Sequence, residues 1–271
     1  MTTPPAPPAP PIDIRPLQTH EEFAACVALQ KETWGASFSE TVPPAILKVV
    51  QRIGGLAAGA FDGDGRLVGF VFGLTGVERG HLVHWSDMLA VRPEARDLGI
   101  GRRLKAYQRE HCRRVGAEVI YWTYDPLVAR NAFLNLERLG ARVVEYVPDM
   151  YGPETDSPLH RGIGSDRFVV AWRTAEPSGT AHALGERVRG AREAPILNPL
   201  GAAPLPATTP VVRVEIPCDI GAVQSTSLPT AAAWRASTRA IFTTTLGRGY
   251  EVAGFYREEG EERCFYVLRN E

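Results

Sequence analysis

The sequence predicts a mixed α/β fold, in which a central twisted sheet carries helices on both faces and a β-α-β-β extension follows at the C-terminal end. Segments of alternating hydrophobicity recur along the chain between segments with helical periodicity. A glycine-rich turn also stands between one such strand and a strongly amphipathic helix. The 271 residues, 44% of them hydrophobic, suffice for one large domain or for a domain with a sizeable extension.

The first part of the chain alternates helices and strands. Thr19-His20-Glu21-Glu22 fits a capping box that begins a helix, and a second helix is expected over residues 43–53. Asp62-Gly63-Asp64-Gly65 predicts a hairpin turn between two strands. Strands are expected over residues 12–17, 55–61, 67–74 and 82–91.

A second set of elements follows the glycine-rich turn. Residues 99–115 predict an amphipathic helix, and residues 117–123 a strand. Asp125-Pro126 predicts the start of a helix that ends at Gly140 and buries one apolar face. That face comprises Ala129, Ala132, Phe133, Leu136 and Leu139. Strands are expected over residues 141–147 and 166–172.

Composition suggests how the chain divides into domains. We expect a Pro/Ala-rich tail over residues 1–11, a main domain over 12–173, a linker over 174–210 and the extension over 211–271. Within the extension, a strand at 211–216, a helix at 229–246 and a hairpin from 250–257 and 263–268 repeat the element order of residues 117–172. A degenerate half-repeat is one interpretation of this order. The hairpin is too apolar to stand alone, so it should pack on the main sheet or pair with a second subunit, and we favour a homodimer.

Charge and composition exclude several classes of protein. The formal net charge of −1 argues against a nucleic-acid binder, and no apolar stretch is long enough to span a membrane. The N-terminus lacks the charged start and apolar centre of a signal peptide, so a cytoplasmic location is expected. Because no two cysteines form a CxxC pair, we expect no metal site and four buried free thiols. These are Cys26, Cys112, Cys218 and Cys264.

The segment Arg96-Asp97-Leu98-Gly99-Ile100-Gly101 carries the strongest functional signal. Two glycines at this spacing let a turn present several N–H groups at a helix N-terminus, where the helix dipole favours an anion such as a pyrophosphate. Arg96, Arg102 and Arg103 add positive charge. A dinucleotide fingerprint and a P-loop both fit poorly, since Leu104 stands where a third small residue is needed and no Gly-Lys-Ser/Thr occurs. The remaining alternative is a turn that only begins the helix.

The run from Met88 to Leu104 resembles motif A of the GNAT superfamily of N-acyltransferases, a strand and Val-x-Pro turn followed by Arg/Gln-x-x-Gly-x-Gly/Ala at a helix start. The similarity in element order covers residues 12–172, and the remainder looks like an uncharacterised subgroup with an extension. The resemblance implies acyl-coenzyme A, with an acetyl or succinyl group, as co-substrate and no metal. It assigns the pyrophosphate to the amides of the loop and the pantetheine to the backbone of the preceding strand. The implied binding residues are Leu98, Gly99, Ile100, Gly101, Arg102 and Arg103 in the loop, and Leu89 and Val91 in the strand.

One departure concerns the general acid. Alignment on Ala132 and Gly140 places Leu136 where the family often carries the tyrosine that protonates the leaving thiolate, and Ala129 at the usual asparagine. Tyr124 is a candidate replacement, with aromatic packing as the alternative.

The attacking amine needs a proton acceptor. Asp87 is the first candidate base and His84 the second. On a regular strand Asp87 would share a face with Trp85 and Leu89. The alternatives are an ion pair for Asp87 and a structural role for His84. Arg235 and Arg239, one helical turn apart, fit either a carboxylate clamp or a solvated helix face.

We therefore expect transfer of an acyl group from acyl-coenzyme A to the amine of a small molecule, an amino acid being one option, by direct attack in a ternary complex. An alternative is a coenzyme A-binding regulatory or scaffold protein without catalysis. A third interpretation makes the extension a partner-binding module.

Overall fold

The structure is a computed structural model that describes residues 11–36, 38–152, 162–176, 188, 190–201, 208–258 and 262–270. Contacts group the chain into two compact units, Met1–Ile120 and Tyr121–Glu271, so the boundary falls within strand β5 (Val119–Tyr124). The predicted α/β class is confirmed, whereas residues 1–10 of the expected tail lie outside the described residues. Among the described residues, no helix is long and apolar enough to cross a membrane.

The first unit is built on four antiparallel strands in chain order. These are β1 (Asp13–Pro16), β2 (Leu56–Phe61), β3 (Leu67–Glu78) and β4 (His81–Val91). β2 is buried along its whole length, and β3 is buried over its first seven residues. The sheet is therefore covered on both faces at its centre.

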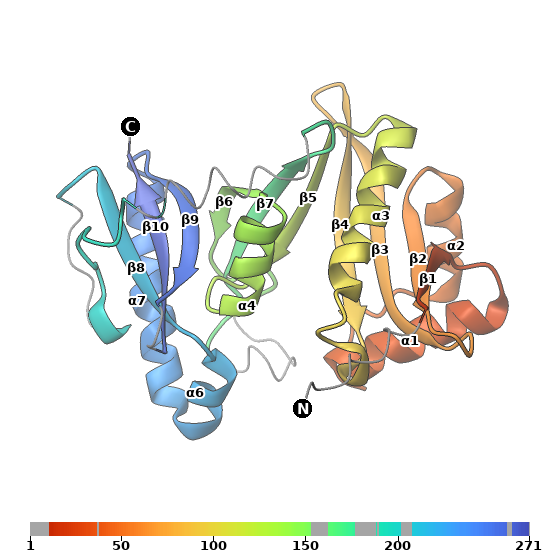
Figure 1. Cartoon of the computed structure of the whole chain (residues 1–271), viewed down its shortest axis with the longest axis horizontal. Helices are drawn as coiled ribbons and strands as arrows, with labels where there is room; N and C mark the ends of the chain where they lie inside the picture. Colours follow the sequence, from red (N-terminus) through yellow and green to blue (C-terminus); the bar gives the residue numbers. More distant parts are fainter. Residues whose placement is uncertain are drawn as a thin grey trace, which may run out of the picture. The chain divides into compact units, whose positions relative to one another are not determined.

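Helices cover both faces of this sheet, as predicted (Figure 1). On one face lie α1 (His20–Trp34), which begins with the expected capping box at Thr19, and α2 (Pro44–Arg52). On the other lies α3 (Ile100–Val115), preceded by the short helix η1 (Pro93–Ala95). Ile100 and Leu104 of α3 pack against alanines and valines of β2 and β3.

The second unit begins with β5, α4 (Ala129–Ala132), a π-helical turn η2 (Phe133–Arg138), β6 (Arg142–Val147) and β7 (Arg167–Arg173). The helix was expected to bury Phe133, but this ring is 41% exposed and lies beside the Arg138 guanidinium. The π-helical turn changes the angular spacing of residues from position 133 onward, so the regular 3.6-residue pattern no longer applies.

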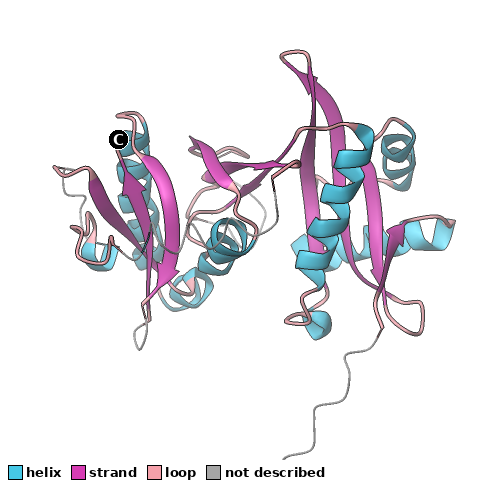
Figure 2. Ribbon diagram, turned by 45° about the horizontal axis from the view of Figure 1, so that its top comes forward, coloured by secondary structure: helices cyan, strands magenta, loops and turns pink. Residues whose placement is uncertain are grey.

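The extension repeats the strand order of the preceding segment. Its elements are β8 (Val211–Pro217), α6 (Ile220–Thr226), α7 (Leu228–Leu246), β9 (Glu251–Arg257) and β10 (Arg263–Arg269). Its sheet runs β8-β10-β9, and the preceding strands run β5-β7-β6; Figure 2 draws these strands in magenta. In each of these two sets of three strands, the strand that comes last in the sequence lies between the other two. The short helix α6 was not expected from the sequence.

Aromatic rings join these two halves of the second unit. Phe168 of β7 packs against Phe242 of α7, with ring centroids 4.7 Å apart, and against Tyr266 of β10 at 5.5 Å. The Tyr266 hydroxyl donates to the carbonyl of Pro126 at 2.8 Å. The C-terminal hairpin thus finds its packing partners within the chain.

The pairing of two cysteines in the second unit differs from expectation. Cys218 and Cys264 form a disulfide, so the prediction of free thiols is wrong for this pair. The antiparallel pairing of β8 with β10 places their Cα atoms 5.6 Å apart. Cys26 and Cys112 are free and buried, as predicted. Within the segment expected to be a linker, Ala191 and Leu197 are buried, and the Leu197 amide bonds to the Arg213 carbonyl.

Candidate functional site

The glycine-rich turn leads directly into α3. Asp97 and Gly99 both adopt left-handed backbone conformations, with φ of 62° and 71°, which reverse the chain just before the helix. Gly99 is the N-cap residue and contributes no side-chain hydrogen bond, so the first N–H groups of α3 are not capped by a side chain at that position. Arg96 and Arg102 are exposed beside this turn. The arrangement provides amide donors, a helix dipole and positive charge for an anion.

Two side chains in the turn have structural roles. Ile100 is 1% exposed and belongs to the core beneath α3, so only its backbone can face a ligand. The Arg103 guanidinium donates to the carbonyl of Ile12 at 2.7 Å and holds the entry to β1. The Leu98 side chain is 45% exposed.

A β-bulge interrupts the pairing of β3 with β4. Phe72 pairs with Met88, whereas the next residue, Gly73, pairs with Ser86, which leaves Asp87 as the extra residue. Met88 packs with α1 and α2, while Leu89 packs against the α3 cluster. Ser86, three residues before Leu89, also contacts α3. Two residues three apart share a face only because the bulge inserts one residue, so simple alternation does not hold across Asp87, and the expectation that Asp87 and Leu89 share a face stays a prediction.

Asp87 is an exposed carboxyl group at this bulge. Desolvation by the surrounding protein raises its pKa, and the negative charge of Glu40, in the connection between α1 and α2, raises it further. A carboxylate of raised pKa that reaches solvent is suited to accept a proton. Leu89 and Val91 follow on the same strand, and their backbones pair with Val71 and Gly69 of β3 on one edge.

His84 lies in a different environment. Its ring is fully buried, with Nδ1 3.0 Å from the Thr75 hydroxyl and Nε2 3.0 Å from the Gln108 amide nitrogen. Since an amide nitrogen only donates, Nε2 is the acceptor and Nδ1 carries the proton. Burial lowers the pKa of His84 to about 3, assisted by the charges of His111 and Lys105. This geometry fits the structural role and leaves no ring nitrogen for a substrate.

The same network holds a residue that sequence reasoning missed. Lys105 of α3 is 5% exposed, and its ammonium donates to the Ser86 hydroxyl at 2.8 Å and to the Gln108 carbonyl oxygen at 3.2 Å. Burial lowers the pKa of Lys105 to about 7. The sequence signal for a buried ammonium was weak, because a lysine on the apolar side of a helix can also bury its alkyl stem and extend its ammonium to solvent.

Tyr124, the candidate proton donor, and Leu136, which stands at the usual position of the acid, lie in the second unit. Tyr124 is 4% exposed; its ring packs against Phe168, and its hydroxyl lies 3.5 Å from that of Tyr266. Burial raises the pKa of Tyr124, which disfavours release of its proton. Leu136 is 2% exposed, as expected for a core residue. The geometry of Tyr124 therefore fits the aromatic-packing alternative.

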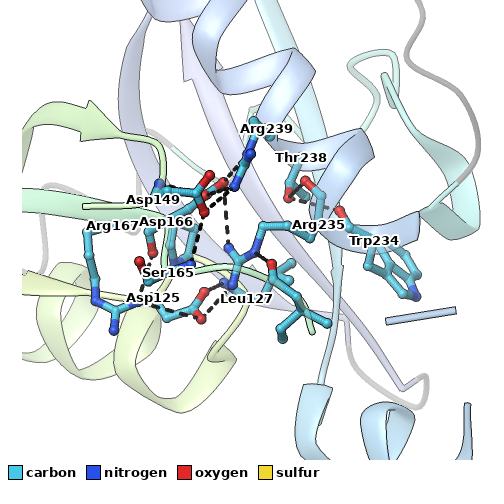
Figure 3. Close-up of polar contacts among 12 residues, drawn as sticks. Asp125, Leu127, Asp149, Ser165, Asp166, Arg167, Trp234, Arg235, Thr238 and Arg239 are labelled. Carbon is cyan, nitrogen blue, oxygen red and sulfur yellow. Dashed lines mark hydrogen bonds and ion pairs between the residues drawn. The ribbon is translucent and has the colours of Figure 1, made fainter. Parts of the chain in front are cut away.

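A dense cluster of charges surrounds the two arginines of α7 (Figure 3). Arg235 is 4% exposed; it donates to Asp125 at 2.6 Å and to the carbonyl of Ile163 at 3.0 Å. Arg239 donates to Asp149 at 2.7 Å and also bonds to Asp166. These arginines tie α7 to the start of α4 and to the β6–β7 connection. The expectation of a solvated helix face is wrong for Arg235. Both guanidinium groups already bind aspartates of this chain, so this pair does not form the expected clamp for a ligand.

The buried histidine leads to a pH prediction. The folded-state pKa of His84, about 3, lies below its ordinary value of 6.5, so the unfolded chain binds the proton first as pH falls. Stability should therefore decline from pH 6.5 toward pH 3 by at most about 1.4 kcal/mol per pH unit for this one proton. Urea unfolding at several pH values should show a shallower acid decline for His84→Gln than for wild type. Equal slopes would contradict the assignment.

Residues 23–140 match the family model described as "Acetyltransferase (GNAT) family", which covers most of the first unit and the start of the second. A search of curated proteins found no match. Among the described residues, no group of three or more His, Cys, Asp or Glu side chains is placed to hold a metal ion.

Solved structures align with a larger part of the chain. A ribosomal-protein-S18-alanine N-acetyltransferase from Escherichia coli aligns at 17% identity and a TM-score of 0.46, over 62% of this chain and 97% of its own. An aminoglycoside 6'-N-acetyltransferase complexed with coenzyme A aligns at 16% identity and a TM-score of 0.46, over 61% and 98%. A chain of the NatC complex bound to Gag peptide and CoA aligns at 19% identity and a TM-score of 0.46, over 60% and 98%.

Proposed function

Because residues 23–140 carry a domain of the GNAT acetyltransferase family, we propose that this protein binds an acyl-coenzyme A and transfers the acyl group to an amine. The observation that carries the proposal is the turn before α3. Its left-handed residues Asp97 and Gly99 bring the chain directly into a helix start that the N-cap side chain does not occupy. An amide cradle of this kind suits a pyrophosphate.

The residues around the turn fit such a ligand. The amides of Leu98–Arg102 would hold the pyrophosphate, with Arg96 and Arg102 exposed beside them, whereas the Arg103 amide already donates to the carbonyl of Gly99 at 3.1 Å. The backbone of Leu89 and Val91 would hold the pantetheine along β4. The bound co-substrate supplies an activated thioester, and an acetyl or a succinyl group is proposed as its acyl chain.

Asp87 is proposed as the general base. It lies four residues before Val91, roughly 13 Å along an extended strand, where an outstretched pantetheine arm would bring the reacting end. Its exposed carboxylate would accept the proton of the attacking amine. We propose that this amine belongs to a small molecule, and an amino acid is one option. Attack in a ternary complex needs no acyl-enzyme. The buried His84 is no longer proposed as a base, since both ring nitrogens are occupied.

One observation favours a second candidate, a coenzyme A-binding protein without catalysis. Leu136 occupies the position expected for the general acid, and the Tyr124 hydroxyl is buried against Tyr266. Incubation of acetyl- and succinyl-coenzyme A with a panel of amines, followed by mass spectrometry, separates the candidates. An acylated amine establishes the enzyme, whereas binding without product for every amine establishes the binder.

Gly101→Ala tests the coenzyme A site itself. A Cβ at position 101 would meet Leu89 at 3.7 Å and Val91 at 4.0 Å, which are ordinary contacts, so the protein accommodates it. Alanine should stabilise the helix by up to about 1 kcal/mol, yet obstruct a ligand on the amides. We expect coenzyme A affinity to fall about tenfold by calorimetry, about 1.4 kcal/mol.

Gly76→Ala on β3 is the matched control, since a Cβ there meets nothing within 4 Å. Its coenzyme A affinity should equal that of wild type. If Gly101→Ala and Gly76→Ala bind coenzyme A equally well, the ligand does not lie on the α3 amides.

A further inference from the structure

A chain of buried hydrogen bonds runs behind the bulge of β4, and the proposed function has not used it. Lys105 donates to the Gln108 carbonyl oxygen, and the Gln108 amide donates to His84. His84 donates in turn to Thr75, whose hydroxyl donates to the carbonyl of Gly54 at 2.8 Å. Every donor in this order meets an acceptor, so the chain fixes the orientation of the Lys105 ammonium.

The other end of this chain is a hydroxyl group. Lys105 donates to Ser86 at 2.8 Å, so the Ser86 oxygen acts as acceptor and its own proton remains available to a further acceptor. Ser86 immediately precedes Asp87, the extra residue of the bulge, where the β3–β4 ladder is interrupted. The hydroxyl therefore lies one residue from the proposed base, on the strand proposed to hold the pantetheine.

We propose that Ser86 is the general acid that protonates the leaving thiolate of coenzyme A, and that Lys105 replaces the proton that Ser86 gives up. This inference rests on the proposed function and identifies its missing acid. Ser86 gives its hydroxyl proton to the leaving sulfur as the carbon–sulfur bond breaks. It takes a proton from the Lys105 ammonium, which becomes a neutral amine. The proton that Asp87 accepts from the attacking amine returns through solvent, so the cycle balances.

The surroundings of Lys105 suit this role. Burial lowers the pKa of Lys105 to about 7, which an acid working near neutral pH requires, and the nearby thiol of Cys112 acts in the opposite direction. The other titratable groups that act on this cluster are His84 of β4 and His111 of α3. β3 contributes the polar side chain of Thr75 to this cluster. Arg109, which follows Lys105 by four residues in α3, is also buried.

The first test uses turnover. Ser86→Ala and Lys105→Met should each lower kcat by about 10- to 100-fold, with coenzyme A affinity unchanged by calorimetry. Ser86→Thr keeps the hydroxyl and should recover most of the rate. In wild type the rate should fall as pH rises through the pKa of Lys105, and this limb should vanish in Lys105→Met. A kcat within about twofold of wild type in both variants, or an unchanged high-pH limb, overturns the proposal.

The second test needs no turnover, so it separates this proposal from failure of the proposed activity. Free coenzyme A carries a thiol whose ionisation is followed by its ultraviolet absorbance. If Ser86 reaches the sulfur, wild-type protein should lower the pKa of the bound thiol, and Ser86→Ala should abolish the shift. Equal thiol titration in wild type and Ser86→Ala overturns the proposal even where no amine is acylated. An acyl group found on Ser86 by mass spectrometry also overturns it, because that marks a nucleophile.

Lys105→Met provides its own folding control. Methionine removes a buried charge and fills a similar volume, so urea unfolding should show equal or greater stability at pH 7. A lower rate in a variant of undiminished stability marks a chemical role for the ammonium. A rate loss that tracks a loss of stability in every variant marks a structural role and overturns the proposal.

Discussion

Replacing Asp87 with asparagine is expected to lower kcat for amine acylation by about 10²- to 10⁴-fold, the usual contribution of a general base. Asparagine keeps the size and polarity of the side chain at the bulge but cannot accept the proton of the attacking amine. Because Asp87 is exposed, the substitution should leave the fold and the coenzyme A affinity unchanged. Steady-state kinetics with an amine identified by the mass-spectrometric panel measures the effect.

Glu40 offers a graded control for the same assignment. Its negative charge contributes to the raised pKa of Asp87, so Glu40→Gln should lower that pKa. The base is active when deprotonated, and the rate therefore rises with pH through the pKa of Asp87. In Glu40→Gln this rising limb should move to lower pH while the plateau rate stays constant. A full rate in Asp87→Asn, or an unmoved limb in Glu40→Gln, would assign the base elsewhere.

Local signals in the sequence predicted most elements of the first unit. Thr19 forms both hydrogen bonds of the expected capping box, and the left-handed Gly99 stands at the predicted start of α3. These features depend on a few neighbouring residues, so the sequence alone contains the physical cause. The bulge at Asp87 depends instead on how β4 pairs with β3, and no local residue type marks it.

The polar residues of the site were harder to predict. The alternation rule predicts that Asp87 and Leu89 share one face, but the rule assumes a regular strand and does not hold across the bulge. Lys105 and Ser86 are 19 residues apart and meet only through the packing of α3 on the sheet. Tyr124 was chosen because it follows a strand, whereas its burial depends on Phe168 and Tyr266, far along the chain.

The arginines of α7 show the same limit of local reasoning. Their one-turn spacing is readable from the sequence, but the hydrogen-bond partners of their guanidinium groups lie 72 to 110 positions away. A helix with two arginines on one side resembles a solvated face until those partners are known. Arg235 is a buried cation because it pairs with distant segments of the chain, and the sequence does not display this long-range pairing.

Arg235→Met is therefore expected to lower the free energy of unfolding of the second unit by about 3–5 kcal/mol, the usual cost of breaking a buried ion pair from one side. The substitution removes the 2.6 Å ion pair of the buried Asp125 and leaves the Arg167 guanidinium, at 3.9 Å, as a more distant cation for the same carboxylate. Urea unfolding followed by circular dichroism measures the change. Arg239→Met is the matched control, since Arg239 is 35% exposed and the buried Asp166 that it leaves still accepts from the Tyr146 hydroxyl and the Asp149 amide.

The double variant Arg235→Met with Asp125→Asn separates charge from packing. Asparagine removes the negative charge at position 125 but keeps an oxygen to accept from the Leu127 amide, as Asp125 does at 2.8 Å. If loss of the Arg235 charge beside the Asp125 carboxylate is the main cost, the double variant should be more stable than Arg235→Met alone, because removal of the second charge relieves the penalty. A double variant as unstable as the single one would instead assign the loss to the packing of the arginine stem. A single variant no less stable than Arg239→Met would show that the Arg235–Asp125 pair contributes little to the stability of this unit.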